Sequence, residues 1–314
     1  MDQSFFCASD GMEIYVRKWF AKDGKAKGVV QLSHGMVEHI ERYEEFAQFL
    51  TTKGFLVVGH DQRGHGQTAL RNGTRGYLGD GDGFQRLVDD VKEINDSIHR
   101  DYSLPVFLLG HSMGSFVARR FIQLHDNQID GVMLSGTGGP KGLLGEVGKI
   151  VAKGVSMWNS PLAPGYLLSK LTFGPFNKGF APSKTDFDWL CRDENEVDCY
   201  LHDPMCGFAC TNKFYVDLFN GISIIHKKNE IKKMDPTLPI MLLSGSADPV
   251  GTEGNGVFAV AKLYKKAGMK DVEVHLYEDC RHEILKETNR QVVFNDILSK
   301  LNEWTEVGAK RVGT

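Results

Sequence analysis

The sequence lacks the features that would assign this chain to several special classes of protein. Its six cysteines are too few, in 314 residues, for the disulfide framework of a small secreted domain. No apolar run approaches the roughly 18 residues of a membrane-spanning helix. Residues 1–6 lack the basic start and apolar core of a signal peptide. We therefore expect a cytoplasmic protein whose cysteines are reduced thiols.

The sequence also has little excess charge and no clear metal-binding pattern. A net charge of −3 gives no electrostatic reason to expect nucleic acid as a partner. Several cysteines gather in one segment, but none forms the C-x-x-C pair that is typical of many zinc sites. This segment contains Cys191, Cys199, His202, Cys206 and Cys210. We expect neither a metal nor an organic cofactor.

Apolar runs of strand length alternate with amphipathic segments of helix length over most of the chain. The runs typical of strands are at residues 13–20, 28–35, 55–59, 105–109, 131–136, 239–245 and 272–277. The helical patterns are at residues 42–53, 84–98, 116–122 and 257–267, and a last helix ends near residue 304. This alternation predicts an α/β fold with a mostly parallel, doubly wound sheet flanked by helices.

The alternation stops in one long segment, residues 139–226, which is rich in glycine, proline and aromatic residues. We predict that this segment is a cap inserted at the carboxyl edge of the sheet, where ligands bind in such folds. The predicted organisation is therefore a core made of residues 1–138 and 227–314, and a cap made of residues 139–226.

The pentapeptide at residues 110–114 has the pattern G-x-S-x-G around Ser112. It follows a predicted buried strand and precedes a predicted helix, which is the context of a nucleophile elbow. Gly110 and Gly114 stand where a Cβ atom would collide with the neighbouring strand or helix. The pattern therefore predicts Ser112 as a nucleophile.

A serine nucleophile needs a base to take its proton and a carboxylate to orient that base. Asp248 and His282 each follow a later predicted strand, in the order that this kind of fold requires. Rival residues fit less well. His275 lies inside a strand, His111 points elsewhere, and Asp279 is only three residues from His282. We predict the triad Ser112, Asp248 and His282.

Acyl transfer creates an oxyanion that needs two N–H donors. The N–H of Met113 lies at the start of the elbow helix, and the N–H of Met36 follows Gly35 in the loop after an earlier strand. We predict these two amides as the oxyanion hole. Glu38 and Arg42 have the spacing of a helical ion pair, which we interpret as structural support.

Five motifs together resemble the monoacylglycerol lipase and lysophospholipase branch of the serine α/β-hydrolases, and they cover nearly the whole chain outside the cap. They are at residues 33–39, 61–66, 110–114, 248–251 and 281–283. The resemblance implies an eight-stranded, mostly parallel sheet with a cap between strands six and seven. It also supports the triad and oxyanion hole. Ser115 departs from the family pattern, which often has glycine there.

The resemblance and the aromatic residues of the cap favour a lipid ester with one acyl chain, such as a monoacylglycerol or a lysophospholipid, as substrate. We predict that Phe173, Phe176 and Phe180 contribute to an acyl groove, together with residues 161–168. The same residues could instead touch a bilayer, which predicts transient membrane contact through the cap. The sequence leaves the oligomeric state open.

Other functions compete with the lipid hypothesis. A general esterase of short-chain or plant-derived esters would use the same triad, and so would a peptidase or an amidase. A binding protein that has lost catalysis is a different class, but every expected catalytic element is present here. Epoxide hydrolase or dehalogenase chemistry is disfavoured because it uses a carboxylate where this chain has Ser112.

Overall fold

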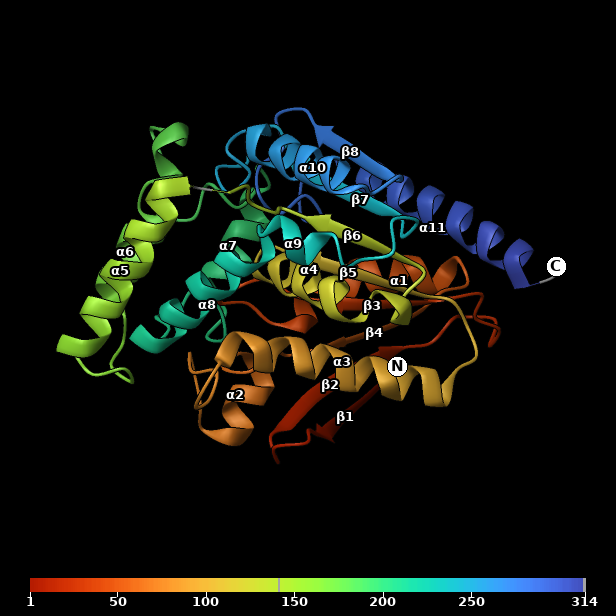
Figure 1. Cartoon of the computed structure of the whole chain (residues 1–314), viewed down its shortest axis with the longest axis horizontal. Coiled ribbons are helices and arrows are strands. Elements are labelled where there is room, and N and C mark those ends of the chain that lie inside the picture. The colour runs from red at the N-terminus through yellow and green to blue at the C-terminus, as the bar shows by residue number, and fades with distance from the viewer. Residues whose placement is uncertain (141, 313–314) are drawn as a thin grey trace.

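An eight-stranded sheet runs through the middle of the computed structural model, which describes residues 1–140 and 142–312 (Figure 1). The strand order is β1-β2-β4-β3-β5-β6-β7-β8. β2 is antiparallel to both of its neighbours, and the remaining pairs are parallel. The strands are β1 (Asp2–Cys7), β2 (Glu13–Trp19), β3 (Val29–Ser33), β4 (Leu56–His60), β5 (Val106–His111), β6 (Gly131–Ser135), β7 (Ile240–Gly245) and β8 (Val272–Tyr277). The predicted α/β-hydrolase fold is confirmed.

The residue pattern predicts seven of these strands and misses β1. Most of this strand is exposed, and it pairs only with β2 at the edge of the sheet. It therefore lacks the apolar run or strict alternation by which a buried strand is recognised. The short helix α2 (Gly66–Asn72) is missed for a similar reason, because its seven residues give only two helical turns of pattern.

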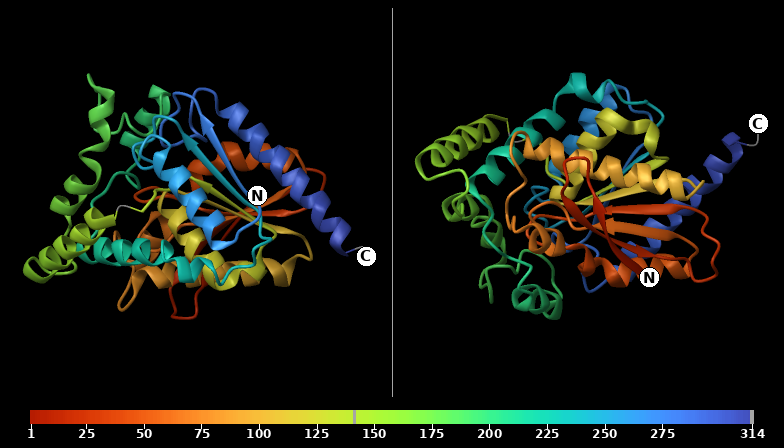
Figure 2. Two further views of the ribbon diagram at one scale, coloured as in Figure 1. Left: turned by 45° about the horizontal axis from the view of Figure 1, so that its top comes forward. Right: turned by 90° about the horizontal axis from the view of Figure 1, so that it is seen from below.

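Helices cover both faces of the sheet, and each face has its own apolar core (Figures 1 and 2). One core joins the strands to α3 (Gly83–Asp101), α4 (Met113–His125) and α10 (Asn255–Ala267). The other joins them to α1 (Glu44–Thr52) and α11 (Arg290–Val312). The central strands are buried on both faces, and their successive side chains enter the two cores alternately.

The chain between β6 and β7 leaves the sheet and is mostly helical. Apart from the short helix α9 near its end, its helices are α5 (Gly142–Trp158), α6 (Tyr166–Phe173), the 3-10 helix η3 (Phe176–Phe180), α7 (Glu194–His202) and α8 (Asn212–Ile225). Helix α8 packs on α3 and α4 and buries Phe214 and Leu218 in the core of that face. In contrast, α5 and α6 project away from the sheet, at the left of Figure 1. Helix α8 thus joins the insertion to the core of this face.

Short helices complete the described chain: η1 (Ile40–Tyr43), η2 (Asp126–Gln128) and α9 (Lys228–Ile231). Among the described residues, we find no helix with the length and apolar character needed to cross a bilayer.

Candidate active site

Ser112 occupies the sharp turn between β5 and α4. Its φ of 51° and ψ of −118° are unfavourable for a residue with a side chain, as expected of a strained elbow. A Cβ atom at Gly110 would collide with the backbone of Gly114, and one at Gly114 would collide with the Ser33 carbonyl. Both glycines are therefore required sterically. Ser115 fits here as well, since its hydroxyl donates to the Ser112 carbonyl oxygen at 2.6 Å.

Asp248 and His282 meet at the carboxyl edge of the sheet, one after β7 and the other after β8. His282 Nδ1 lies 3.0 Å from both carboxylate oxygens of Asp248. The two residues are 0% and 2% exposed. His282 and Ser112 line the same cavity. Because Asp248 contacts Nδ1, Nε2 is the ring nitrogen that remains for another partner.

The charges of this pair stabilise each other. Burial opposes the ionised form of Asp248, but the neighbouring His282 outweighs it and lowers the pKa of that carboxyl group. Burial likewise opposes the imidazolium of His282, but Asp248 and the nearby acidic groups outweigh it and raise the pKa of the imidazole. The surroundings of His282 therefore stabilise the protonated form of its imidazole.

The rival residues make other contacts, although the His111 ring lies beside that of His282. His111 is buried, which lowers its pKa to about 4, and its Nδ1 is 3.2 Å from Ser135 Oγ. His275 lies on β8, with its Nε2 3.5 Å from a Glu273 oxygen. Asp279 is exposed, and its backbone N–H donates to Ser246 Oγ.

The loop that carries Met36 is held in place by buried polar groups. Glu38 Oε1 accepts the Gly35 N–H at 2.5 Å. The N–H of Met36 is the next one along the chain. Met36 lines the cavity that contains Ser112. Behind the loop, His34 Nε2 accepts the Gln62 N–H at 2.9 Å. Burial lowers the pKa of His34, so its ring is neutral and can accept this bond.

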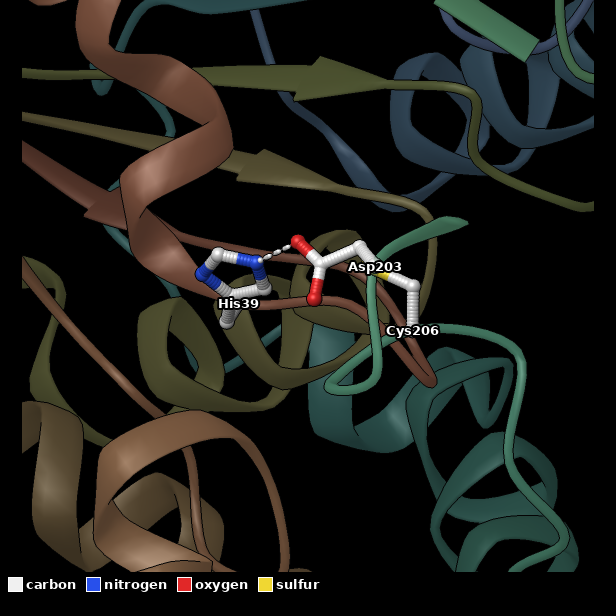
Figure 3. A group of neighbouring side chains, drawn as sticks. All are labelled: His39, Asp203 and Cys206. Atoms are coloured by element: carbon white, nitrogen blue, oxygen red, sulfur yellow. Dashed lines mark hydrogen bonds and ion pairs between the residues drawn. The ribbon is translucent and has the colours of Figure 1, made fainter. Parts of the chain in front are cut away.

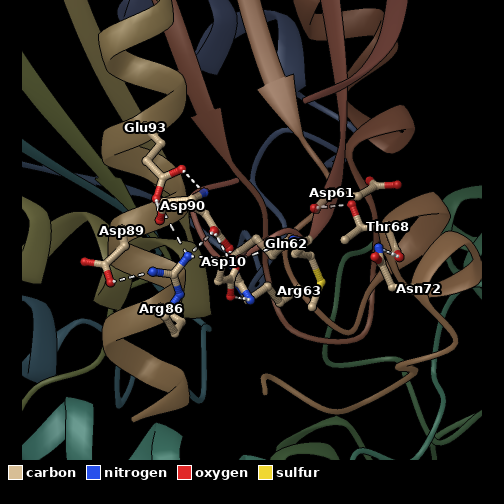
Figure 4. Close-up of polar contacts among 12 residues, drawn as sticks. Asp10, Asp61, Gln62, Arg63, Thr68, Asn72, Arg86, Asp89, Asp90 and Glu93 are labelled. Carbon is tan, nitrogen blue, oxygen red and sulfur yellow. Dashed lines mark hydrogen bonds and ion pairs between the residues drawn. The ribbon is translucent and has the colours of Figure 1, made fainter. Parts of the chain in front are cut away.

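A network of ion pairs anchors the segment at residues 61–66 that supports this loop (Figure 4). Arg63 is 1% exposed and binds Asp90 through two hydrogen bonds of 2.5 and 2.8 Å. Arg63 also binds both oxygens of Asp10, at the β1–β2 turn. Asp61 accepts the Ile40 N–H at 2.8 Å. The sequence shows this motif, but its role as a support depends on contacts that are distant along the chain.

A second bridge links the Met36 loop to the His282 loop. Arg42 donates to Glu38 at 2.8 Å, so the predicted ion pair forms, although Glu38 precedes the helix η1 that carries Arg42. Arg42 also binds both oxygens of Glu283 at 2.6 and 2.7 Å. Burial opposes ionisation of Glu283, but Arg42 outweighs it and lowers the pKa of Glu283 to about 2. The role of Glu283 could not be found from the sequence, because it lies 241 residues from Arg42.

A cavity of about 500 Å³ lies over Ser112 and is roofed by the cap. Aromatic and apolar cap residues in its lining are Tyr166, Phe173, Phe187, Trp189, Leu190, Tyr200 and Phe208. Of the three phenylalanines expected in a groove, Phe173 lies in this lining. The ring of Phe176 packs against Trp189 instead, with centroids 5.0 Å apart. Phe180 lies under the Arg281 guanidinium at 4.4 Å. The aromatic content of the cap indicates such a lining, but not which rings form it.

One group of described side chains could share a cation: His39, Asp203 and Cys206 (Figure 3). Their donor atoms all lie within 4.8 Å of one another. His39 Nε2 is already 2.7 Å from an oxygen of Asp203, and burial raises the pKa of the Cys206 thiol and keeps it neutral. We therefore interpret this group as a polar contact between a core loop and the cap.

The fold and this constellation define a serine hydrolase of the α/β-hydrolase class. The family described as "Serine aminopeptidase, S33" matches residues 24–289. The human monoglyceride lipase is 31% identical over 98% of this chain and 91% of its own. The chain belongs to this family and, within it, to the monoglyceride lipase branch. It is a serine carboxylester hydrolase.

Two further proteins are similar to the chain. A monoacylglycerol lipase from Mycolicibacterium smegmatis is 26% identical over 94% of each chain. A thermostable carboxyl esterase from Bacillus coagulans is 27% identical, covers 97% of this chain and 98% of its own, and superposes with a TM-score of 0.90.

Proposed function

We propose that this protein hydrolyses lipid esters with one acyl chain, a monoacylglycerol or a lysophospholipid, through an acyl-enzyme. The observation that carries the proposal is the cavity of about 500 Å³ that contains Ser112 and His282 and has an aromatic roof. A pocket of this size is large enough for a single chain, and its apolar rings favour binding of hydrocarbon. The monoglyceride lipase relatives support the same substrate class.

In the proposed mechanism, Ser112 Oγ bonds to the ester carbonyl carbon while His282 Nε2 takes the hydroxyl proton. The N–H groups of Met36 and Met113 hold the resulting oxyanion. The bond to the alcohol then breaks, and His282 returns its proton to the alcohol oxygen. Water next attacks the acyl-enzyme and gives a proton to His282, and the fatty acid leaves as Ser112 recovers its hydrogen. Asp248 holds the imidazole in the required tautomer.

A panel of substrates tests the proposal. Wild-type protein and Ser112→Ala are compared on monoacylglycerols of increasing chain length, lysophosphatidylcholine, and the acetate and butyrate esters of p-nitrophenol. We expect long single-chain lipids to have the highest kcat/KM, and the variant to be inactive. Full activity of Ser112→Ala would refute the mechanism, and a steep preference for the acetate would refute the lipid substrate.

A general short-chain esterase is the second candidate, and the similarity to the carboxyl esterase from Bacillus coagulans favours it. The same panel separates the two functions. An acyl anilide added to the panel tests amide cleavage, which the family description as an aminopeptidase makes worth measuring. Labelling of Ser112 by a fluorophosphonate separates all of these enzymes from a binding protein, which would not react.

We further propose that the cap contacts a membrane surface to collect its substrate. Large apolar side chains are exposed on α5, α6 and the loop between them: Ile150, Met157, Trp158, Leu162, Tyr166, Leu167 and Leu171. Trp158 is 95% exposed. An exposed group of this kind on one side of a molecule is typical of an interaction surface, and tryptophan favours the bilayer interface.

The six cysteines are all free, which supports a reducing compartment as the site of action.

A further inference from the structure

Trp189 lies against the imidazole of His282. Their ring centroids are 5.1 Å apart and the rings are inclined by 38°. Trp189 comes from the cap, between η3 and α7, and is only 6% exposed. On its other sides, it stacks with Phe173 at 6.0 Å and meets the edge of Phe176 at 5.0 Å. The indole therefore stands between the aromatic cluster of the cap and the proposed catalytic base.

The backbone around Trp189 is bound to the loop that carries His282. The His282 N–H donates to the Trp189 carbonyl at 3.3 Å, and the Glu283 N–H donates to the Leu190 carbonyl at 2.6 Å. The Arg281 guanidinium donates to the carbonyl groups of Asp188 and Cys191. Cap residues 188–191 thus form a short strap that follows the His282 loop, and this strap fixes the position of the indole.

Contacts with Glu287 and Asn289 extend the strap. Arg192 binds Glu287 at 2.8 Å and Asn289 at 3.0 Å. Glu287 is fully buried. A buried carboxylate that accepts hydrogen bonds from a guanidinium is a strong, directional anchor. Residues before and after Trp189 in the chain therefore make polar contacts that hold the indole in place.

The charged form of His282 arises only during the reaction, and several groups face it. Asp248 and Glu283 are negative and favour the imidazolium, and Glu38 acts in the same direction from the Met36 loop. His111, whose ring centroid is 4.7 Å away, is neutral because burial lowers its pKa to about 4. A cation that lies over the face of an aromatic ring, within about 6 Å of the ring centroid, is attracted by the ring quadrupole, and tryptophan attracts it most strongly.

We propose that Trp189 is a positioning residue for the hydrolysis: its indole holds the His282 ring in place and favours the imidazolium that forms as Ser112 attacks. This inference rests on the proposed function, in which His282 is the base. It makes the cap a contributor to the proton transfer as well as a cover for the substrate. Trp189 also lines the cavity, so its effect on the base must be measured separately from its effect on substrate binding.

The test compares Trp189→Phe with Trp189→Leu. Leucine keeps the imidazole covered by an apolar group but removes the quadrupole, whereas phenylalanine retains a weaker one. The pKa of His282 is measured by NMR titration of protein labelled with 15N-histidine, with the signal assigned by His282→Gln. We expect Trp189→Leu to lower this pKa by about half a unit to one unit, and Trp189→Phe to lower it less.

Kinetics with p-nitrophenyl butyrate provide a second readout that does not depend on the lipid substrate. We expect kcat to fall roughly three- to tenfold in Trp189→Leu, with a smaller change in KM, and to recover in part in Trp189→Phe. Phe176→Leu is the matched control, since it loosens the same aromatic cluster without touching the imidazole. It should leave the His282 pKa unchanged.

An unchanged or raised His282 pKa in Trp189→Leu would overturn the inference, because a residue that only seals the site from water would raise the pKa when it is removed. An equal shift in Phe176→Leu would also overturn it. The NMR titration needs no turnover, so it stands even if the lipid substrate is wrong. Conversely, an inactive wild-type protein with the expected pKa shifts would refute the proposed function alone.

Discussion

The cavity has a core wall and a cap wall, and different interactions hold each wall in place. On the core side, the loops are fixed by buried ion pairs, in which Arg63 and Asp90 are each 1% exposed. On the cap side, aromatic rings roof the cavity, and the outer surface exposes Met157 and Trp158 to 85% and 95%. Buried polar geometry is lost when one group is removed, whereas apolar packing tolerates substitution. We therefore expect substitutions on the outer surface of the cap to change the choice of substrate without changing the bond-breaking step, whereas Trp189 on its inner side affects both.

The largest expected effect concerns the core wall. Ser112→Ala removes the nucleophile, and we expect kcat for p-nitrophenyl butyrate to fall by about 10⁶-fold with an unchanged melting temperature. Ser97→Ala, on the outer surface of α3, is the control and should behave as wild type. If Ser112→Ala retained a large part of the activity, catalysis would not depend on Ser112 in the core wall.

Asp248→Asn should lower kcat by about 10⁴-fold, because the amide favours the wrong imidazole tautomer. The control is Asp279→Asn, which changes an exposed carboxylate only three residues before His282. It should retain wild-type kinetics. A comparable loss in both variants would mean that Asp279, and not Asp248 alone, orients the imidazole.

Arg42→Met breaks the bridge between the two loops of the core wall and leaves Glu38 and Glu283 buried without their partner. We expect a loss of about 3–5 kcal/mol in the free energy of unfolding, measured in urea. The control Arg71→Met breaks an exposed pair with Glu13, in which the side chains are 53% and 41% exposed, and should leave the unfolding midpoint close to that of wild type. Equal destabilisation would remove the distinction between buried and exposed pairs.

The pH dependence tests the electrostatics of the same wall. His282 must be neutral to accept a proton, and its pKa is raised above 6.5 because Asp248 and the nearby acidic groups outweigh burial. The kcat/KM for a soluble ester should therefore fall as the pH drops through a midpoint above 6.5, about tenfold for each unit well below it. A midpoint below 6.5 would show that burial dominates.

The smallest expected effect concerns the outer surface of the cap. Trp158→Ser should lower the rate on monoacylglycerol presented in vesicles by a few fold, while the rate on soluble p-nitrophenyl butyrate stays unchanged. Leu70→Ser removes an apolar group that is 61% exposed on α2, outside the cap, and should change neither rate. Equal rates on vesicles for Trp158→Ser and wild type would contradict membrane contact through this surface.

The core wall could be predicted from the sequence further than the cap could. Ser112, Asp248 and His282 each follow a recognisable strand, so local pattern and chain order are enough to bring them to one edge. Glu283 escapes this reasoning because its partner is distant in sequence. The position of Trp189 could not be predicted either, because the cap sequence has no regular spacing that distinguishes rings lining the cavity from rings packed behind them.

The cap contacts the core through α8, through the strap at residues 188–191 and through the His39–Asp203 contact. All three follow the segment at residues 142–180, which contains α5, α6 and η3. We therefore expect that this outer segment can be exchanged for the corresponding segment of a related protein. We expect that transplanting the corresponding segment of a related hydrolase, with Phe173 and Phe176 retained beside Trp189, would change the chain-length preference and leave His282 in its native position.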